Sequence, residues 1–253
     1  MTDATNSART SAETELRGQT VVVVGGSSGI GLETARRARA AGAEVVLTAR
    51  TPERLDRVAR ELQASFTAAF DATDLGRLEQ FFTELPNPID HVMVTAGGPL
   101  YMPLASMNLD EARRHVDQRL SLTLGTALFT RRKVRPGGSL LFVGGTGARR
   151  PGVGLAIAST LTAALPALTA NLALELAPTR VNLIAPGFVD TPLSASLLGD
   201  QIEARRNELR ALLPIGRVVG PADVAALAVH IMSNEALTGG TYDIDGGQQL
   251  IAR

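Results

Sequence analysis

The first residues whose types and spacing could do chemistry form a glycine-rich turn, GGSSGIG at residues 25–31, directly after the β-branched run TVVVV. Glycine permits a tight turn and lets backbone N–H groups approach a phosphate with no side chain in between. The turn lacks the Lys-Ser/Thr pair of a nucleoside triphosphate loop. A tight turn without a ligand is the alternative interpretation. At the junction of a first strand and a first helix, the turn predicts a dinucleotide site, with a pyrophosphate held by Gly25, Ser27, Ser28, Gly29, Ile30 and Gly31.

The end of the second predicted strand indicates which dinucleotide is bound. A site for NAD normally offers a carboxylate there to the ribose 2′-OH, about 20 residues beyond the glycines. This chain has Ala49 at that place, followed by Arg50 and Thr51, with Arg54 one helical turn further on. Without a carboxylate a 2′-phosphate is not repelled, and Arg50 can pair with it. We therefore predict NADP(H) as the cofactor; the alternative is that both arginines only solvate a loop.

Short apolar runs alternate with amphipathic segments along the rest of the chain, and this pattern predicts the elements that position the turn. Parallel neighbouring strands need crossover connections, which the helical segments supply. The pattern predicts a single doubly wound, Rossmann-type α/β domain over residues 18–253, with a mostly parallel sheet and helices on both faces. Residues 1–17 are polar and aperiodic, so we expect a flexible tail. Expected strands cover 19–26, 43–50, 66–72, 90–98, 138–145, 180–186 and the final GGTYDID; expected helices cover 29–42, 52–64, 74–85, 109–132, 156–177 and 222–232.

Composition limits the class of partner. The formal net charge is zero and 45% of the residues are hydrophobic, which gives no reason to expect nucleic acid and favours a small-molecule substrate. The chain contains no cysteine, and its three histidines are scattered, so no metal site is predicted. We expect no apolar run of the roughly 20 residues that a membrane span needs, and no signal peptide, which together predict a cytoplasmic protein.

The segment 156–177 is apolar nearly all round, with Glu175 as its only charge. A helix that lies on one face of a sheet normally has a polar outer stripe. We therefore expect another copy of the chain to cover this helix, giving a homodimer or a homotetramer. Coverage by loops of the same chain is the alternative.

Several motifs together resemble the short-chain dehydrogenase/reductase family from Gly18 to the end of the chain. The glycine spacing matches the family's motif, and Val94-Thr95-Ala96-Gly97 is similar to its Asn-Asn-Ala-Gly. The segments LALELAP at 172–178, RVNLIAPG at 180–187 and DIDGG at 243–247 follow in the family's order. The resemblance implies contacts with the adenine from Asp71 and Ala72, cofactor contacts from Ala96 and Gly97, and contacts with the nicotinamide end from Pro186, Gly187, Val189 and Thr191. It also implies a helical lid over residues 190–214.

The resemblance fails where the family's catalytic residues belong. Its Tyr-x-x-x-Lys falls on Ala158 and Thr162 when counted from LALELAP, or on Ala156 and Thr160 when counted from the Pro-Gly turn, and its Ser falls on Gly145. The family's Asn on the long helix has no Asn counterpart, and the nearest polar candidate is Arg119. The segment GLAIASTLT at 154–162 contains no acid, base, thiol or phenol. The usual proton donor is therefore missing.

Weak candidates remain for handling the proton or the substrate oxygen. Tyr101 follows the Ala-Gly-Gly segment and could supply a phenol, although a tyrosine there more often packs across the rim. Thr146 and Ser159 could donate hydrogen bonds to a substrate oxygen, and Arg149 and Arg150 could stabilise an oxyanion. Three interpretations stay open: an NADP(H)-dependent oxidoreductase with a non-standard active site for a carbonyl, quinone or enone; a catalytically inactive NADP(H) sensor or partner-binding protein; and a structural subunit of a mixed oligomer.

Overall fold

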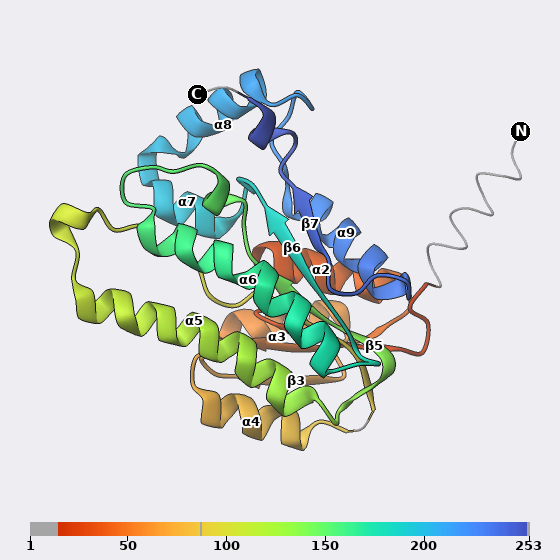
Figure 1. Ribbon diagram of the computed structural model, residues 1–253. Helices are drawn as coiled ribbons and strands as arrows, with labels where there is room; N and C mark the ends of the chain where they lie inside the picture. Colours follow the sequence, from red (N-terminus) through yellow and green to blue (C-terminus); the bar gives the residue numbers. More distant parts are fainter. Residues whose placement is uncertain (1–14, 87, 252–253) are drawn as a thin grey trace, which may run out of the picture.

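Seven strands form one parallel sheet in the order β3-β2-β1-β4-β5-β6-β7 (Figure 1). The computed structural model describes residues 15–86 and 88–251. The strand order reverses between β1 and β4, where ligands bind in open α/β sheets. The strands are β1 (Thr20–Val24), β2 (Glu44–Ala49), β3 (Phe66–Ala69), β4 (Ile89–Val94), β5 (Val134–Val143), β6 (Arg180–Pro186) and β7 (Thr241–Ile244).

Helices cover both faces of the sheet, which confirms the predicted doubly wound architecture. One face packs against α2 (Gly29–Ala40), α3 (Pro52–Leu62) and α9 (Pro221–Ser233). The other face packs against α4 (Leu75–Glu84), α5 (Leu109–Thr130) and α6 (Ala156–Glu175). After β6 the chain forms α7 (Pro192–Leu198) and α8 (Ile202–Leu212) beyond the carboxyl ends of the strands (Figure 1).

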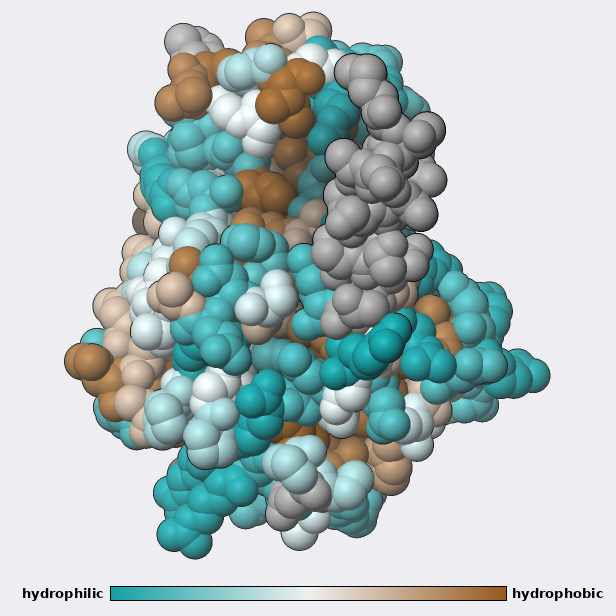
Figure 2. Space-filling model, turned by 90° about the vertical axis from the view of Figure 1, so that its right-hand side faces the viewer, coloured by the Kyte–Doolittle hydropathy of each residue, from teal (hydrophilic) through white to brown (hydrophobic). Residues whose placement is uncertain are grey.

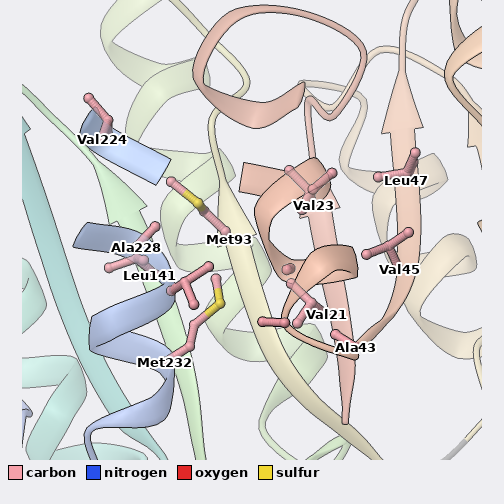
Figure 3. Close-up of a cluster of buried hydrophobic side chains, with 14 of the residues drawn as sticks. Val21, Val23, Ala43, Val45, Leu47, Met93, Leu141, Val224, Ala228 and Met232 are labelled. Carbon is pink, nitrogen blue, oxygen red and sulfur yellow. The ribbon is translucent and has the colours of Figure 1, made fainter. Parts of the chain in front are cut away.

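Strand alternation divides the core into two layers, because successive side chains of a strand point to opposite faces. Val21 and Val23 of β1 enter the layer under α2, α3 and α9, where Met93 and Leu141 join them (Figure 3). Val22 enters the opposite layer, under α4, α5 and α6. Most side chains of the central strands are apolar in both layers, which explains why these strands read as apolar runs; the buried His91 and Ser139 are exceptions.

Three element ends differ from the sequence expectation. The flexible tail does not extend to residue 17, because the Leu16 side chain is fully buried in the core and its N–H donates to the Ala41 carbonyl oxygen at 3.0 Å. Residues 1–14 of that tail lie outside the described residues. Strand β4 ends at Val94 rather than at residue 98. Strand β5 begins at Val134 rather than at residue 138, because Val134 pairs with Ile89 ahead of an irregularity in the register.

Helix α6 has an uneven environment. Leu161, Leu165 and Leu172 are buried against the sheet, whereas Leu174 is 80% exposed. Over an 18-residue window its mean hydropathy is 1.5, so by length and composition alone it could cross a membrane. The expectation that no apolar stretch is long enough is therefore wrong. Core helices of globular domains meet the same criterion; α6 packs on the sheet with one side only, since 28% of that window is buried.

Candidate coenzyme and substrate site

The glycine turn is packed so tightly that side chains cannot enter it. A Cβ atom on Gly25 would lie 2.8 Å from the backbone nitrogen of Ala96, and one on Gly31 would lie 2.2 Å from the Gly25 carbonyl oxygen. Gly25 and Gly29 also have positive φ angles of 99° and 54°, which side chains rarely adopt. The turn therefore leaves a backbone cradle at the carboxyl ends of β1 and β4.

The first turn of α2 is open to a ligand. Ser28 is the N-cap residue, yet its side chain makes no capping hydrogen bond, and the first turn contains no acidic residue. Uncapped N–H groups and the positive end of the helix dipole favour an anion. These features fit a pyrophosphate beside Ser27, Ser28 and Ile30, as the sequence predicts.

The adenine side of the cradle is built by β2 and the segment after β3. The N–H groups of Gly25 and Gly26 donate to the Thr48 carbonyl oxygen at 3.1 and 2.9 Å, which holds the glycine turn beside the end of β2. Arg50 follows directly and is exposed, and Thr51 is the N-cap residue of α3. The Asp71 carboxylate accepts hydrogen bonds from the N–H and hydroxyl of Thr73, which lower its pKa, with a smaller contribution from the charge of Arg50.

The end of β6 brings the other half of the predicted set to the same cradle. A Cβ atom on Gly29 would lie 3.5 Å from Thr191, so the segment after the Pro186-Gly187 turn lies against the glycine turn. Thr191 accepts a hydrogen bond from Ser194 N–H and caps α7. Val189 is buried and pairs with Val219 in an isolated bridge. The structure thus places Thr191, from the group predicted at the nicotinamide end, against the glycine turn.

The positions onto which the resemblance maps the family's catalytic residues, in either register, hold small or internally bonded side chains. A Cβ atom on Gly145 would lie 3.5 Å from Thr162 Cγ2, which shows that these two positions are neighbours. The Thr162 hydroxyl donates to the Ala158 carbonyl oxygen of its own helix at 2.9 Å, and Ala158 is buried. The Ser159 hydroxyl donates to the Gly147 carbonyl oxygen at 3.1 Å. Neither hydroxyl is available to act as an acid.

The other predicted candidates are no better placed. Thr146 is buried. Tyr101 is 53% exposed, and its partial burial raises the phenol pKa, which makes it a weaker acid. Arg149 forms a forked ion pair with Asp243, with one arm at 2.7 Å, and Arg150 donates to the Ile251 carbonyl oxygen. The expectation that these two arginines are free to stabilise an oxyanion is therefore wrong.

Two polar side chains of α5 lie near the carboxyl ends of β4 and β5: Arg119, which the sequence offered only as the nearest polar candidate for the family's asparagine, and His115, which it did not single out. Arg119 on α5 donates to two carbonyl oxygens. One belongs to Ala96, just after β4, at 2.8 Å, and the other to Val143, the last residue of β5. One turn earlier, the Nε2 atom of His115 is buried without a hydrogen-bond partner among the described residues. Burial and the nearby charge of Arg119 lower the pKa of His115, and the Gly98 backbone opposes this. Their four-residue spacing on one helix face was the available signal.

A helical segment lies over the carboxyl edge of the sheet. Residues 192–212 form α7, a short 3-10 turn and α8, and a Cβ atom on Gly98 would lie 3.6 Å from the Leu193 side chain. Asp190 pairs with Arg206 of α8 at 2.6 Å, which ties the segment to the end of β6. In the space-filling view hydrophobic side chains line a hollow in the upper half of the molecule, toward which the strands of Figure 1 point (Figure 2).

Within residues 15–86 and 88–251 no group of three or more His, Asp or Glu side chains is placed to hold a metal ion. The fold and the glycine cradle define a dinucleotide-binding protein of the doubly wound class.

Comparison with known proteins identifies the family. The sequence model described as enoyl-(acyl carrier protein) reductase matches residues 24–249. Dehydrogenase/reductase SDR family member 4 of Sus scrofa is 32% identical over 246 residues, covering 92% of this chain and 88% of the relative. The short-chain dehydrogenase/reductase ATR9 of Stachybotrys chlorohalonatus is 30% identical, covering 93% of this chain and 98% of the relative. The chain belongs to the short-chain dehydrogenase/reductase family and is an oxidoreductase of that family.

Solved structures of relatives share the fold. A short-chain dehydrogenase/reductase from Brucella melitensis superposes with a TM-score of 0.85 at 27% identity and covers 93% of this chain and 98% of its own. A small-chain dehydrogenase in complex with NADPH superposes with a TM-score of 0.78 at 26% identity and covers 92% of this chain and 99% of its own. The family binds nicotinamide cofactors, and the cradle described above fits that role.

Proposed function

We propose that the chain is an NADP(H)-dependent oxidoreductase with a non-standard active site, acting on a small molecule that carries a carbonyl, quinone or enone. The observation that carries this proposal is the placement of Arg50 at the end of β2, beside the glycine turn and without a carboxylate at Ala49. A guanidinium there matches a 2′-phosphate in charge and geometry. The relative described as an NADPH complex is consistent with this choice of cofactor.

The chain's own residues divide the work of the site. The N–H groups at the start of α2 hold the pyrophosphate, and Arg50 and Thr51 hold the adenosine phosphate. Gly187, Val189 and Thr191 line the nicotinamide end. The bound cofactor supplies hydride chemistry. The helical segment 190–214 acts as a lid that excludes water from the cleft.

Cofactor titration tests the proposal. We expect the fluorescence of NADPH to increase saturably when it binds, with a dissociation constant at least about tenfold below that of NADH, because a charge-assisted pair contributes about 1.5–3 kcal/mol. Arg50→Ala weakens NADPH binding by about that factor and leaves NADH unchanged. Arg57→Ala, which removes another exposed arginine of α3, serves as the control. Equal affinity for both cofactors in the wild-type protein contradicts the NADP(H) assignment.

A second function is favoured by Ala158 and Thr162, which stand where the family has its tyrosine and lysine. A chain without that pair can serve as an inactive NADP(H) sensor or a partner-binding protein. Losing one general acid costs about 10² to 10⁴ in rate, which slows hydride transfer without abolishing it. Measuring NADPH oxidation with aldehydes, ketones, quinones and enones separates the two: turnover with any of them supports the enzyme, and none with all of them supports the sensor.

We also propose that the chain forms a homodimer or a homotetramer through α6. The neighbouring helices α5 and α6 run side by side (Figure 1). Together they expose Leu124, Leu128 and Leu174. Apolar side chains on two adjacent helices suit the same surface of a second copy.

A further inference from the structure

We propose that Arg119 binds an oxygen anion of the substrate, so that the site takes small planar molecules whose oxygen carries delocalised negative charge, such as a phenolate or an enolate. This inference rests on the proposed oxidoreductase function, because it places the substrate beside the cofactor cradle. It goes beyond that function by naming the chemical class of the substrate and the side chain that selects it.

The position of Arg119 is the first argument. Its guanidinium lies against the carboxyl ends of β4 and β5, where it donates to the carbonyl oxygens of Ala96 and Val143. A Cβ atom on Gly97 would lie 2.7 Å from the Nη1 atom of Arg119, so a side chain at residue 97 would collide with the guanidinium. Gly97 follows the strand next to the glycine turn. Ligands of open α/β sheets bind at this edge.

The charge of Arg119 is the second argument. A guanidinium does not give up its proton in proteins. Among the described residues no carboxylate forms a salt bridge with Arg119. Its two hydrogen bonds go to neutral carbonyl groups and use two of its five N–H groups. A partly buried cation without an anionic partner is costly, and a substrate anion would supply the partner.

The neighbouring side chains are the third argument. The resemblance puts the family's serine at Gly145 and its tyrosine and lysine at Ala158 and Thr162 or at Ala156 and Thr160, so in either register no phenol or ammonium competes for the substrate oxygen. Because burial and Arg119 both lower the pKa of His115, that imidazole is neutral at neutral pH and adds no second charge. Its buried Nε2 atom has no partner among the described residues. A planar guanidinium beside a neutral imidazole suits an oxygen on a flat conjugated group.

A purely structural role for Arg119 makes a different prediction. If the side chain only ties the ends of β4 and β5 together, its removal lowers the stability of the fold and has no effect that depends on the charge of a ligand. The test must therefore compare ligands of the same shape and different charge.

We would titrate 4-nitrophenolate, at a pH where the phenol is ionised, and the neutral 4-nitroaniline, which has nearly the same planar shape, into the full-length protein by calorimetry, with and without saturating NADP⁺. We expect the wild-type protein to prefer the anion. Arg119→Met weakens binding of the anion by about tenfold to a hundredfold, the range for a hydrogen-bonded charged pair, and leaves the neutral analogue unchanged. Arg119→Lys keeps the charge and retains part of the preference. Arg113→Met removes an exposed arginine of the same helix and serves as the control.

Each outcome decides the matter. Equal affinity of the wild-type protein for the two probes overturns the inference without any variant. An Arg119→Met protein that melts as a folded protein and still prefers the anion also overturns it. If that variant does not fold, the wild-type preference and the partial retention in Arg119→Lys decide. If NADPH does not bind the wild-type protein, the proposed function is wrong. If NADPH binds but the protein shows no preference for the anion, only the present inference is wrong.

Discussion

The stability of the fold should depend on pH through His91, a fully buried residue of β4. Its Nδ1 atom is 2.8 Å from the Ser139 hydroxyl and its Nε2 atom is 2.6 Å from Gln19 Oε1. Burial lowers its pKa from 6.5 to about 3, with Asp90 opposing the shift and the charges of Arg180 and Arg135 adding to it. The imidazole is therefore neutral in the folded protein and takes up a proton only when it reaches water.

The sign and size of the effect follow from proton linkage. Below pH 6.5 the unfolded chain binds a proton that the folded chain does not, so acid favours unfolding. The stabilising contribution is complete above the unfolded pKa and is lost progressively as the pH falls toward the folded pKa of about 3. Between about pH 8 and about pH 5 the free energy of unfolding should fall by about 2 kcal/mol from this residue alone.

Urea unfolding at the two pH values measures this difference. His91→Gln keeps a side chain that can hydrogen-bond to its neighbours and removes the titrating group. The free energy of unfolding of this variant should therefore fall by about 2 kcal/mol less than that of the wild-type protein over the same pH interval. The exposed His230 of α9 is the matched control, and His230→Gln should retain the wild-type pH dependence. Parallel pH profiles for the wild-type protein and His91→Gln would refute the argument.

Three further predictions concern the site and the surface. Gly31→Ala should abolish the saturable increase in NADPH fluorescence, because the added Cβ atom would lie 2.2 Å from the Gly25 carbonyl oxygen, while circular dichroism shows a folded protein. An unchanged affinity for NADPH would show that the glycine turn does not bind the cofactor. Tyr101→Phe should change NADPH oxidation less than about twofold in a substrate screen, since the phenol is half exposed and its pKa is raised; a larger loss would make Tyr101 the proton donor. Leu174→Asp should reduce the mass measured by light scattering to that of a single chain, and an unchanged mass would exclude this face.

The alternation of strands and helices made the fold predictable from the sequence. Continuous valine runs in β1 and β2 are buried on both faces, and their glycine or charged ends mark where the chain turns. The ends of elements were less predictable because tertiary pairing decides them. The stretch VRPGG reads as a turn, yet it belongs to β5, since Val134 pairs with Ile89. Leu16 reads as part of a polar tail, but its side chain fills the core under α2.

The site was predictable on the cofactor side and not on the substrate side, for a physical reason. A backbone cradle needs glycine at fixed positions, and such a pattern can be recognised from residue types alone. The placement of a charged side chain depends on which helix lies against which strand end. In the sequence Arg149 reads as a free cation, whereas Asp243 of β7 holds it. Arg119 reads only as a loose substitute for asparagine, whereas it reaches the ends of two strands.

We propose that Arg119 supplies positive charge close to the place where the resemblance puts the family's lysine. Counted from LALELAP, that place is Thr162, which lies next to Gly145, two residues beyond the carbonyl that Arg119 binds at Val143. Thr162→Lys should therefore bring a second cation near Arg119 and destabilise the protein more when Arg119 is present than in an Arg119→Asn background. A double-mutant cycle measured by urea unfolding should give a coupling of about 1 kcal/mol, the order expected for like charges at partly buried positions. A coupling near zero would show that Arg119 does not occupy the place of the missing lysine, and the threonine at 162 and the arginine at 119 would then need separate explanations.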